Sequence, residues 1–162
     1  MNSTESQTQT PSTTISTMKI HPPLLALVLL TVTLVLHFML PEERAVGWEQ
    51  AIGLLFVAVG VGVSCFAAAI FQARDTTKNP WGEPTQFVVQ APFTSTRNPM
   101  YLGLTATLFG LAVFFGSIVM LAGPVVFFAV IDRLVIPREE ETMERRFGQD
   151  YRDYSYRVRR WL

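Results

Sequence analysis

Residues 100–131 contain no Asp, Glu, Lys or Arg, and this uncharged, mostly apolar run most constrains what the chain can fold into. Ordinary soluble domains lack such runs, so the sequence predicts a membrane protein. As one helix, about 32 residues at about 1.5 Å each would extend about 48 Å, well beyond a hydrocarbon core of about 30 Å. Phe115-Gly116-Ser117 offers a break within the run. We therefore predict two helices, 99–115 and 117–136, packed as a hairpin, the second bent at Gly123-Pro124.

Two further apolar blocks precede this hairpin, at residues 24–40 and 51–71. Each is long enough to cross a bilayer, because a transmembrane helix needs about 17–25 apolar residues. Trp48 precedes the second block at a position that favours the headgroup layer. The sequence thus predicts an all-α, multipass membrane protein with about four transmembrane helices, the last two forming the hairpin.

The basic residues fall mainly on one side of this arrangement. Of the 13 Lys and Arg residues, only Arg44 lies opposite the Lys19 end, the 72–98 loop and the C-terminal segment. Cytoplasmic segments carry such an excess of positive charge, so we expect both termini in the cytoplasm. The 13 acidic residues balance the basic ones, so no overall charge favours a nucleic-acid partner.

The chain divides into four units. Residues 1–18 are polar and rich in Ser and Thr, which predicts a disordered tail and not a cleaved signal peptide. The remaining units are two transmembrane helices (19–72), a cytoplasmic loop (73–98), and the hairpin with a C-terminal segment (99–162).

The last 26 or so residues are charged and predict an amphipathic helix in the cytoplasm. Pro137 favours a helix start and Gly148 a helix end. Tyr151, Tyr154 and Val158 are spaced three or four apart, so we expect them to share one buried face.

Charged residues in two segments near the membrane, Arg159-Arg160 and Asp132, need partners or a suitable boundary. Arg159-Arg160-Trp161 suits the lipid headgroup layer. Asp132 lies at the cytoplasmic end of the last predicted transmembrane helix, where an acid is costly unless it is paired. Either Arg133 or a pocket residue could supply that partner.

Several other residues predict packing and not chemistry. Cys65 is the single cysteine, which excludes a disulfide framework and a multi-cysteine metal site; we expect no metal. Gly60, Ser64 and Ala68, at four-residue spacing, predict a helix-packing face, and no strand precedes Gly60-Val61-Gly62 to form a nucleotide loop. His37 stands alone near a helix end and is not expected to act as a ligand.

The segment Arg97-Asn98-Pro99-Met100-Tyr101-Leu102-Gly103 is the most informative of the chain. A purely structural interpretation has Asn98 capping a helix, Pro99 at its first position and Arg97 at the membrane interface. A functional interpretation has Arg, Asn and Tyr side chains meeting at a helix start, whose unpaired amides suit a ligand carboxylate. Gly103 would let a ligand or a neighbouring helix approach the backbone.

Glu139 and Glu140 follow the last transmembrane helix directly. They are either partners of the helix dipole or acceptors for a ligand ammonium or for ribose hydroxyls. The residues alone leave both interpretations open.

Taken together, T-R-N-P-M-Y-L-G, the apolar hairpin and R-E-E-E-T-M-E-R-R-F-G-Q-D-Y-R-D-Y resemble one family of integral membrane enzymes. They are similar to the isoprenylcysteine carboxyl methyltransferase and phospholipid methyltransferase group, whose pattern is R-H-P-x-Y-x-G before the hairpin and E-E with F-G-x-x-Y-x-x-Y after it. The resemblance covers roughly residues 85–160. Asn98 departs from the family's His and, unlike His, cannot titrate near neutral pH.

The resemblance implies S-adenosylmethionine as methyl donor, bound on the cytoplasmic side between the hairpin and the C-terminal helix. By position, the residues implied to bind this cofactor are Asn98, Tyr101, Leu102, Gly103, Glu139, Glu140, Tyr151 and Tyr154, with Arg97 and Glu140 implied as catalytic. The reaction implied is in-line displacement at the sulfonium methyl, in which alignment and exclusion of water supply most of the catalysis.

The acceptor implied is a lipophilic molecule or a lipid that enters from the bilayer. An ammonium acceptor must first lose a proton, and no residue clearly supplies a base, which favours a carboxylate or thiolate over a phospholipid amine. The sequence also allows a homo-oligomer.

Two alternatives use the same architecture. A membrane reductase of the steroid or isoprenoid type would need a basic site for NADPH, to which Arg157, Arg159 and Arg160 could contribute. A non-enzymatic four-helix membrane scaffold would explain the hydrophobicity but not the clustering of Arg97, Tyr101 and Glu140.

Overall fold

The computed structural model describes residues 20–40, 47–74 and 90–162, and all regular structure in these ranges is helical. The helices are α1 (Pro22–Met39), α2 (Trp48–Arg74), α3 (Pro99–Phe115), α4 (Ala122–Val130), α5 (Ile136–Phe147) and α6 (Gln149–Arg157), with a 3₁₀ turn at Val119–Leu121 and a π-helical segment at Ile131–Val135. The all-α prediction is confirmed for the described residues. The predicted tail at 1–18 and most of the predicted 73–98 loop lie outside them.

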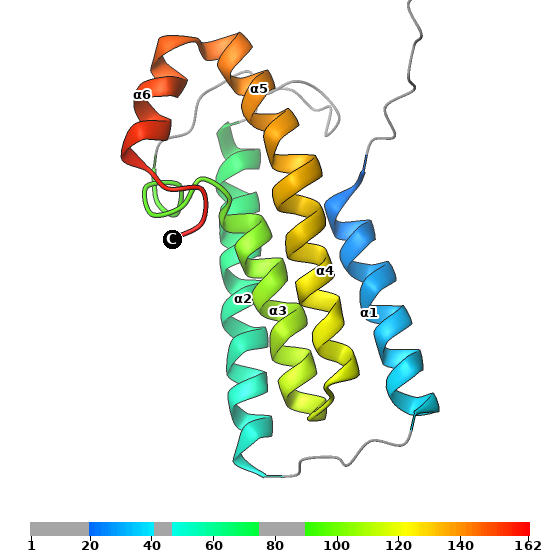
Figure 1. The fold of residues 1–162 in the computed structure, drawn as a ribbon. Helices are drawn as coiled ribbons and strands as arrows, with labels where there is room; N and C mark the ends of the chain where they lie inside the picture. The colour runs from blue at the N-terminus through cyan, green and yellow to red at the C-terminus, as the bar shows by residue number, and fades with distance from the viewer. Residues whose placement is uncertain (1–19, 41–46, 75–89) are drawn as a thin grey trace, which may run out of the picture.

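Helices α1, α2, α3 and α4 run side by side in a bundle, and α5 and α6 project from one end of it (Figure 1). Among the described residues, three helices are apolar and long enough to cross a bilayer, namely Pro22–Met39, Trp48–Ile70 and Val119–Phe147, while α3 is shorter at 17 residues. Large apolar side chains are exposed along the bundle, such as Leu27, Leu55 and Val125 at 58%, 61% and 67%. Such a surface suits lipid and not water, so the chain is a membrane protein.

The predicted hairpin at Gly116 is present. Gly116 takes a left-handed conformation with φ of 60°, and its amide bonds back to the carbonyls of Ala112 and Val113. Glycine adopts this conformation without the steric cost that a side chain would bring. The Ser117 hydroxyl then accepts a hydrogen bond from the Met120 amide at 3.1 Å, which begins the returning helix.

The helix start predicted at Pro137 falls in the first turn of α5 (Ile136–Phe147), but α5 is continuous with the preceding helix, because one helical run extends from Val119 to Phe147. A proline ring normally clashes with the carbonyl four residues earlier. Here the π-helical segment precedes Pro137, and the Ile136 amide bonds to the Ile131 carbonyl, five residues back. The wider turn accommodates the ring, so the charged α5 extends the transmembrane helix without a break.

Helices α2 and α3 pack closely through small residues. A Cβ on Gly60 would lie 2.6 Å from the Gly103 carbonyl oxygen, and one on Gly110 would lie 2.7 Å from the Gly53 carbonyl oxygen. The Ser64 hydroxyl also donates to the Met100 carbonyl at 3.0 Å. The predicted small-residue face is therefore confirmed at Gly60 and Ser64, and α3 is its partner.

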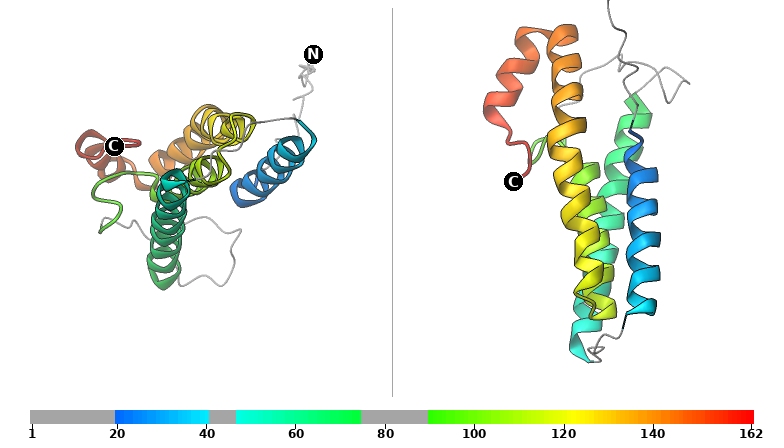
Figure 2. Two further views of the ribbon diagram at one scale, coloured as in Figure 1. Left: turned by 90° about the horizontal axis from the view of Figure 1, so that it is seen from below. Right: turned by 45° about the vertical axis from the view of Figure 1, so that its right-hand side comes forward.

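The opposite side of α3 faces the last long helix and α1. Phe127, Ile131 and Ile136 are fully buried there, and Ala26 of α1 joins the same cluster. The end-on view in Figure 2 places α3 between α2 on one side and α1 with α4 on the other. At the far end of the bundle, the His37 ring packs against Phe115 with ring centroids 5.5 Å apart, which is a packing role.

Candidate functional site

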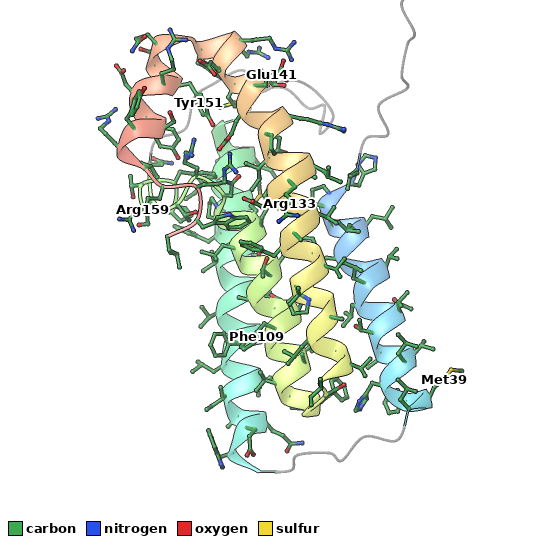
Figure 3. All side chains as sticks on the ribbon, in the orientation of Figure 1. Met39, Phe109, Arg133, Glu141, Tyr151 and Arg159 are labelled. Atoms are coloured by element: carbon green, nitrogen blue, oxygen red, sulfur yellow. The ribbon has the colours of Figure 1, made fainter. Side chains whose placement is uncertain are left out.

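Three segments distant in sequence meet at the end of the bundle that carries α5 and α6. They are residues 96–101, which lead into α3; residues 132–140 of the last long helix; and residues 158–162, which follow α6. Figure 3 places Glu141, Tyr151 and Arg159 at this end and Met39 at the opposite end. The predicted convergence of the Arg97 segment with the Glu139–Glu140 pair is therefore present.

Glu140 lies at the centre of this polar site. Its Oε1 is 3.1 Å from Nη1 of Arg97, and its Oε2 is 2.6 Å from Nη2 of Arg160. Nε of Arg160 also donates to Glu140 Oε1 at 3.2 Å. The Glu140 carboxylate raises the pKa of the Arg160 guanidinium, so one acid holds two fixed cations.

Asp132 finds its partners in the C-terminal residues. Its Oδ1 accepts from Nη1 of Arg160 at 3.3 Å and from the Trp161 indole at 2.9 Å. The Trp161 ring stacks on Phe128 of α4, with ring centroids 4.5 Å apart. The expectation that Asp132 must be paired is confirmed, and of the two options considered, the partner is a site residue, Arg160, in place of Arg133.

The start of α3 contributes Tyr101 and Asn98. The Tyr101 hydroxyl donates to Glu139 Oε1 at 2.6 Å, and the Tyr101 side chain is buried. Pro99 takes the first helical turn as expected, but Asn98 makes no capping hydrogen bond with its side chain. Its Nδ2 instead donates to the Arg160 carbonyl at 3.0 Å. Asn98 thus joins α3 to the C-terminal residues.

Helix α6 closes the site from the side. Gly148, with φ of 53°, turns the chain sharply after α5, so Tyr151, Tyr154 and Val158 face inward, as the spacing predicted. Burial raises the pKa of Tyr154 to about 12, and its hydroxyl donates to the Phe93 carbonyl at 2.7 Å. Burial also raises the pKa of Tyr151, and the nearby Glu140 carboxylate raises it further.

Two predicted site residues have other surroundings. Gly103 faces α2, where a Cβ would lie 2.5 Å from the Gly60 carbonyl oxygen, so its small size serves the neighbouring helix. Leu102 is half-buried in the first turns of α3. The roles of both in cofactor binding stay predictions.

Some residues of the site were missed by sequence reasoning. Thr96 is buried, and its hydroxyl donates to the Arg160 carbonyl at 3.1 Å. The Arg97 amide donates to the Arg159 carbonyl at 3.0 Å. Arg160 and Trp161 were placed at the headgroup layer, not at Glu140 and Asp132. In the sequence, only Asp132, an acid at a membrane helix end that required a partner, indicated that such a cation was needed.

The chemistry of the site fits a zwitterionic, hydroxyl-bearing ligand. Arg97 has a buried Nε that no polar group among the described residues satisfies, and its side chain is 16% exposed. The Arg97 guanidinium could pair with a ligand carboxylate, while the acids Glu140 and Glu139 are acceptors for an ammonium or for ribose hydroxyls. Among the described residues, no group of three or more His, Cys, Asp or Glu could hold a metal ion.

The fold and the site thus define a helical membrane protein with a cluster of paired charged side chains at one end of its bundle. A model of the family described as phospholipid methyltransferase matches residues 48–150. This chain belongs to that family, and it is accordingly a membrane methyltransferase in general terms.

Two further comparisons with known proteins do not indicate a function. An uncharacterized protein of Haemophilus influenzae is 40% identical over 63 residues, which are 39% of this chain and the whole of that protein. No solved structure matches the chain.

Proposed function

We propose that the protein transfers a methyl group from S-adenosylmethionine to a lipophilic acceptor that enters from the bilayer. The observation that carries the proposal is Arg97, whose unsatisfied buried Nε lies beside Glu140 at the entrance to α3. A buried donor without a partner is uncommon in folded proteins, and a functional role is one of its explanations. The family match supports methyl transfer, and the resemblance of the R-N-P-x-Y-x-G segment supports this donor.

Each part of the site takes a role in binding the donor. Arg97 binds the carboxylate of the methyl donor. Glu140 pairs with Arg97 and so fixes the orientation of the Arg97 guanidinium. Tyr101 fixes Glu139, whose second oxygen accepts from the ribose or the ammonium group. Tyr151 and Tyr154 exclude water from the α6 side, because both are buried against the site.

When bound, S-adenosylmethionine supplies an activated methyl group on a sulfonium. Since this group is already activated, the chain needs only to align it and keep water away. The carboxylate of Glu140 and the hydroxyl of Tyr101 are both fixed by hydrogen bonds, which limits their motion and favours one bound orientation. The apolar surfaces of α1 and α4 would lead a lipophilic acceptor to the site through the bilayer.

The class of methyl acceptor depends on whether a residue of the site can remove a proton from it. Glu139 accepts a hydrogen bond from the Tyr101 hydroxyl, whereas Glu140 and Asp132 are paired with the Arg160 guanidinium. An acid paired with a cation is a poor general base, so Glu140 and Asp132 favour a carboxylate or thiolate acceptor, which needs no deprotonation by the protein. The family is that of phospholipid methyltransferases, so a phospholipid amine is the competing acceptor.

The decisive experiment measures binding and transfer separately. Calorimetry of the purified protein with S-adenosylmethionine and with NADPH distinguishes methyl transfer from reduction. We expect donor binding that Glu140→Gln weakens about tenfold or more, because the neutral amide no longer holds Arg97. Glu144→Gln is the matched control, since Glu144 also pairs with an arginine at 3.1 Å but lies on the exposed side of α5.

The acceptor is identified with a labelled methyl donor and a panel of phospholipids, prenyl thiols and fatty acids, analysed by mass spectrometry. Methylation of a panel member by the wild type and not by Glu140→Gln supports the proposal. Binding of NADPH alone would favour a reductase, and binding of neither cofactor would favour a scaffold.

We also propose that the site faces the cytoplasm, with both termini on that side, because the basic residues concentrate there. In a Cys65→Ser background, Ile118→Cys at the hairpin and Tyr156→Cys on α6 provide probes at side chains 81% and 88% exposed. An impermeant maleimide added to intact cells should label the first and spare the second. Labelling of both, or of Tyr156→Cys alone, would contradict this orientation.

A further inference from the structure

The last five residues form a segment, hereafter the C-terminal strap (residues 158–162), that crosses the start of α3. Its main chain accepts three hydrogen bonds from that region: the Arg159 carbonyl from the Arg97 amide at 3.0 Å, and the Arg160 carbonyl from Asn98 Nδ2 and Thr96 Oγ1 at 3.0 and 3.1 Å. The strap is therefore attached directly to the residues expected to bind the methyl donor.

The Arg160 side chain connects the strap to the last long helix. Its guanidinium binds Glu140 through Nε and Nη2, and Asp132 through Nη1. A planar guanidinium with five donors can hold two carboxylates in fixed directions, which an ammonium group cannot do. Arg160 is thus the one described residue that contacts both acids and, through its carbonyl, Asn98.

The two arginines that pair with Glu140 differ in exposure and in hydrogen bonding. Arg97 is 16% exposed and keeps an unsatisfied Nε, whereas Arg160 is 34% exposed, and each of its three nitrogens donates to an acid. All three nitrogens of this cation are thus engaged by acids of the chain, in contrast to those of Arg97. Its contribution is to the orientation of Glu140, and hence of Arg97.

We propose that Arg160 is a positioning residue of the donor site: it orients Glu140 against Arg97 and, through Asp132, holds the C-terminal strap closed over the start of α3. This inference rests on the proposed function for its ligand. It adds a residue outside the motifs that carry the family resemblance, and it gives Asn98 a structural task in this chain, as the attachment point for the Arg160 carbonyl.

A double-mutant cycle tests whether Arg160 acts through Glu140. The affinity for S-adenosylhomocysteine is measured by calorimetry in the wild type, Arg160→Met, Glu140→Gln and the double variant. We expect Arg160→Met to weaken binding about tenfold and the double variant to bind no worse than Glu140→Gln alone. Arg152→Met and Glu144→Gln provide a matched cycle on an ion pair outside the site, expected to change affinity less than about twofold.

A second measurement follows the strap itself. With Trp48→Phe and Trp81→Phe, Trp161 is the remaining tryptophan, and its emission reports the contact with Phe128 and Asp132. Arg160→Met should shift this emission towards that of exposed indole, and Arg160→Lys should restore affinity only in part, because a lysine cannot bind both acids. Thermal unfolding of each variant, compared with the wild type, identifies any variant that has failed to fold. If Arg160→Met has failed to fold, the affinity of Arg160→Lys is compared with that of the wild type instead.

The outcomes separate the two proposals. If the wild type binds no S-adenosylhomocysteine, the proposed function fails and this inference fails with it. If the wild type binds and Arg160→Met binds equally well, only the role of Arg160 is overturned. Additive losses in the double variant would also overturn it, because they would mean that Arg160 acts independently of Glu140.

Discussion

The two interfaces of α3 are built on opposite physical principles. Along its length, α3 meets α2 through glycines, with backbone against backbone at Gly60–Gly103 and Gly53–Gly110. At its start, α3 meets the C-terminal strap through charges and hydrogen bonds around Glu140 and Arg160. The first interface lies along the apolar part of the bundle and the second at its polar end.

The difference shows how each interface tolerates change. The backbones of α2 and α3 can touch only because no side chain lies between them, so any added side chain must displace a helix. The polar interface depends on partners that water can partly replace, because Arg160 and Asp132 are about one-third exposed. We therefore expect the glycine interface to determine whether the protein folds, and the polar interface to determine whether it binds.

The largest effect is expected for Gly103→Val. A Cβ at Gly103 would lie 2.5 Å from the Gly60 carbonyl oxygen and 2.9 Å from the Ser64 amide nitrogen, both of them backbone atoms. Overpacking of this kind costs about 3 kcal/mol or more when rigid backbone must move. Little folded protein should be recovered, as measured by size-exclusion chromatography and circular dichroism in detergent.

Gly62→Val is the matched control for that change. Gly62 lies on the same helix as Gly60, but a Cβ there would meet nothing within 4 Å. The same substitution should therefore yield normal amounts of folded protein. Equal loss in both variants would mean that valine at a helix glycine, and not the α2–α3 contact, causes the defect.

A smaller effect is expected from removal of the polar interface. Deletion of residues 159–162 removes Arg160 from Glu140 and both of the described partners of Asp132, but touches none of the α2–α3 contacts. We expect a loss of about 1–3 kcal/mol in unfolding free energy, with the bundle intact by circular dichroism. Collapse of the whole fold would contradict the division between the two interfaces.

The two interfaces also differ in how far the sequence predicts them. The α2 face and the hairpin follow from signals a few residues apart, such as Gly60 with Ser64, or Gly116 alone, because helix periodicity and backbone sterics act locally. The meeting of Arg97 with Glu140 follows once the hairpin is placed. These parts were predicted correctly.

The partners of the C-terminal strap were beyond such signals. Glu140 and Arg160 are twenty positions apart around the corner at Gly148, and several arginines nearby have the same charge. Only the path of the chain selects one of them. Pro137 shows the converse case, in which a strong local rule was overridden because the preceding π-helical segment accommodated the proline.

The smallest effect is expected for Tyr154→Phe. This substitution removes a single hydroxyl from the cluster of Tyr151, Tyr154 and Val158, next to the C-terminal strap. Its hydrogen bond to the Phe93 carbonyl, at 2.7 Å, joins α6 to the segment before α3, so its loss should cost about 1 kcal/mol of unfolding free energy. Tyr156→Phe is the control, because Tyr156 is 88% exposed. Denaturant titration of the detergent-solubilised protein measures both.

The pH dependence of the same variant has a definite sign. The folded-state pKa of Tyr154 is raised to about 12, above the usual value of about 10, so the folded state favours the protonated phenol. The stability that this phenol contributes is fully present below about pH 10 and is lost as the pH rises towards 12. The difference between the wild type and Tyr154→Phe should therefore shrink across that window. A constant difference would mean that Tyr154 is accessible to water in the folded protein, and that α6 does not seal this side of the site.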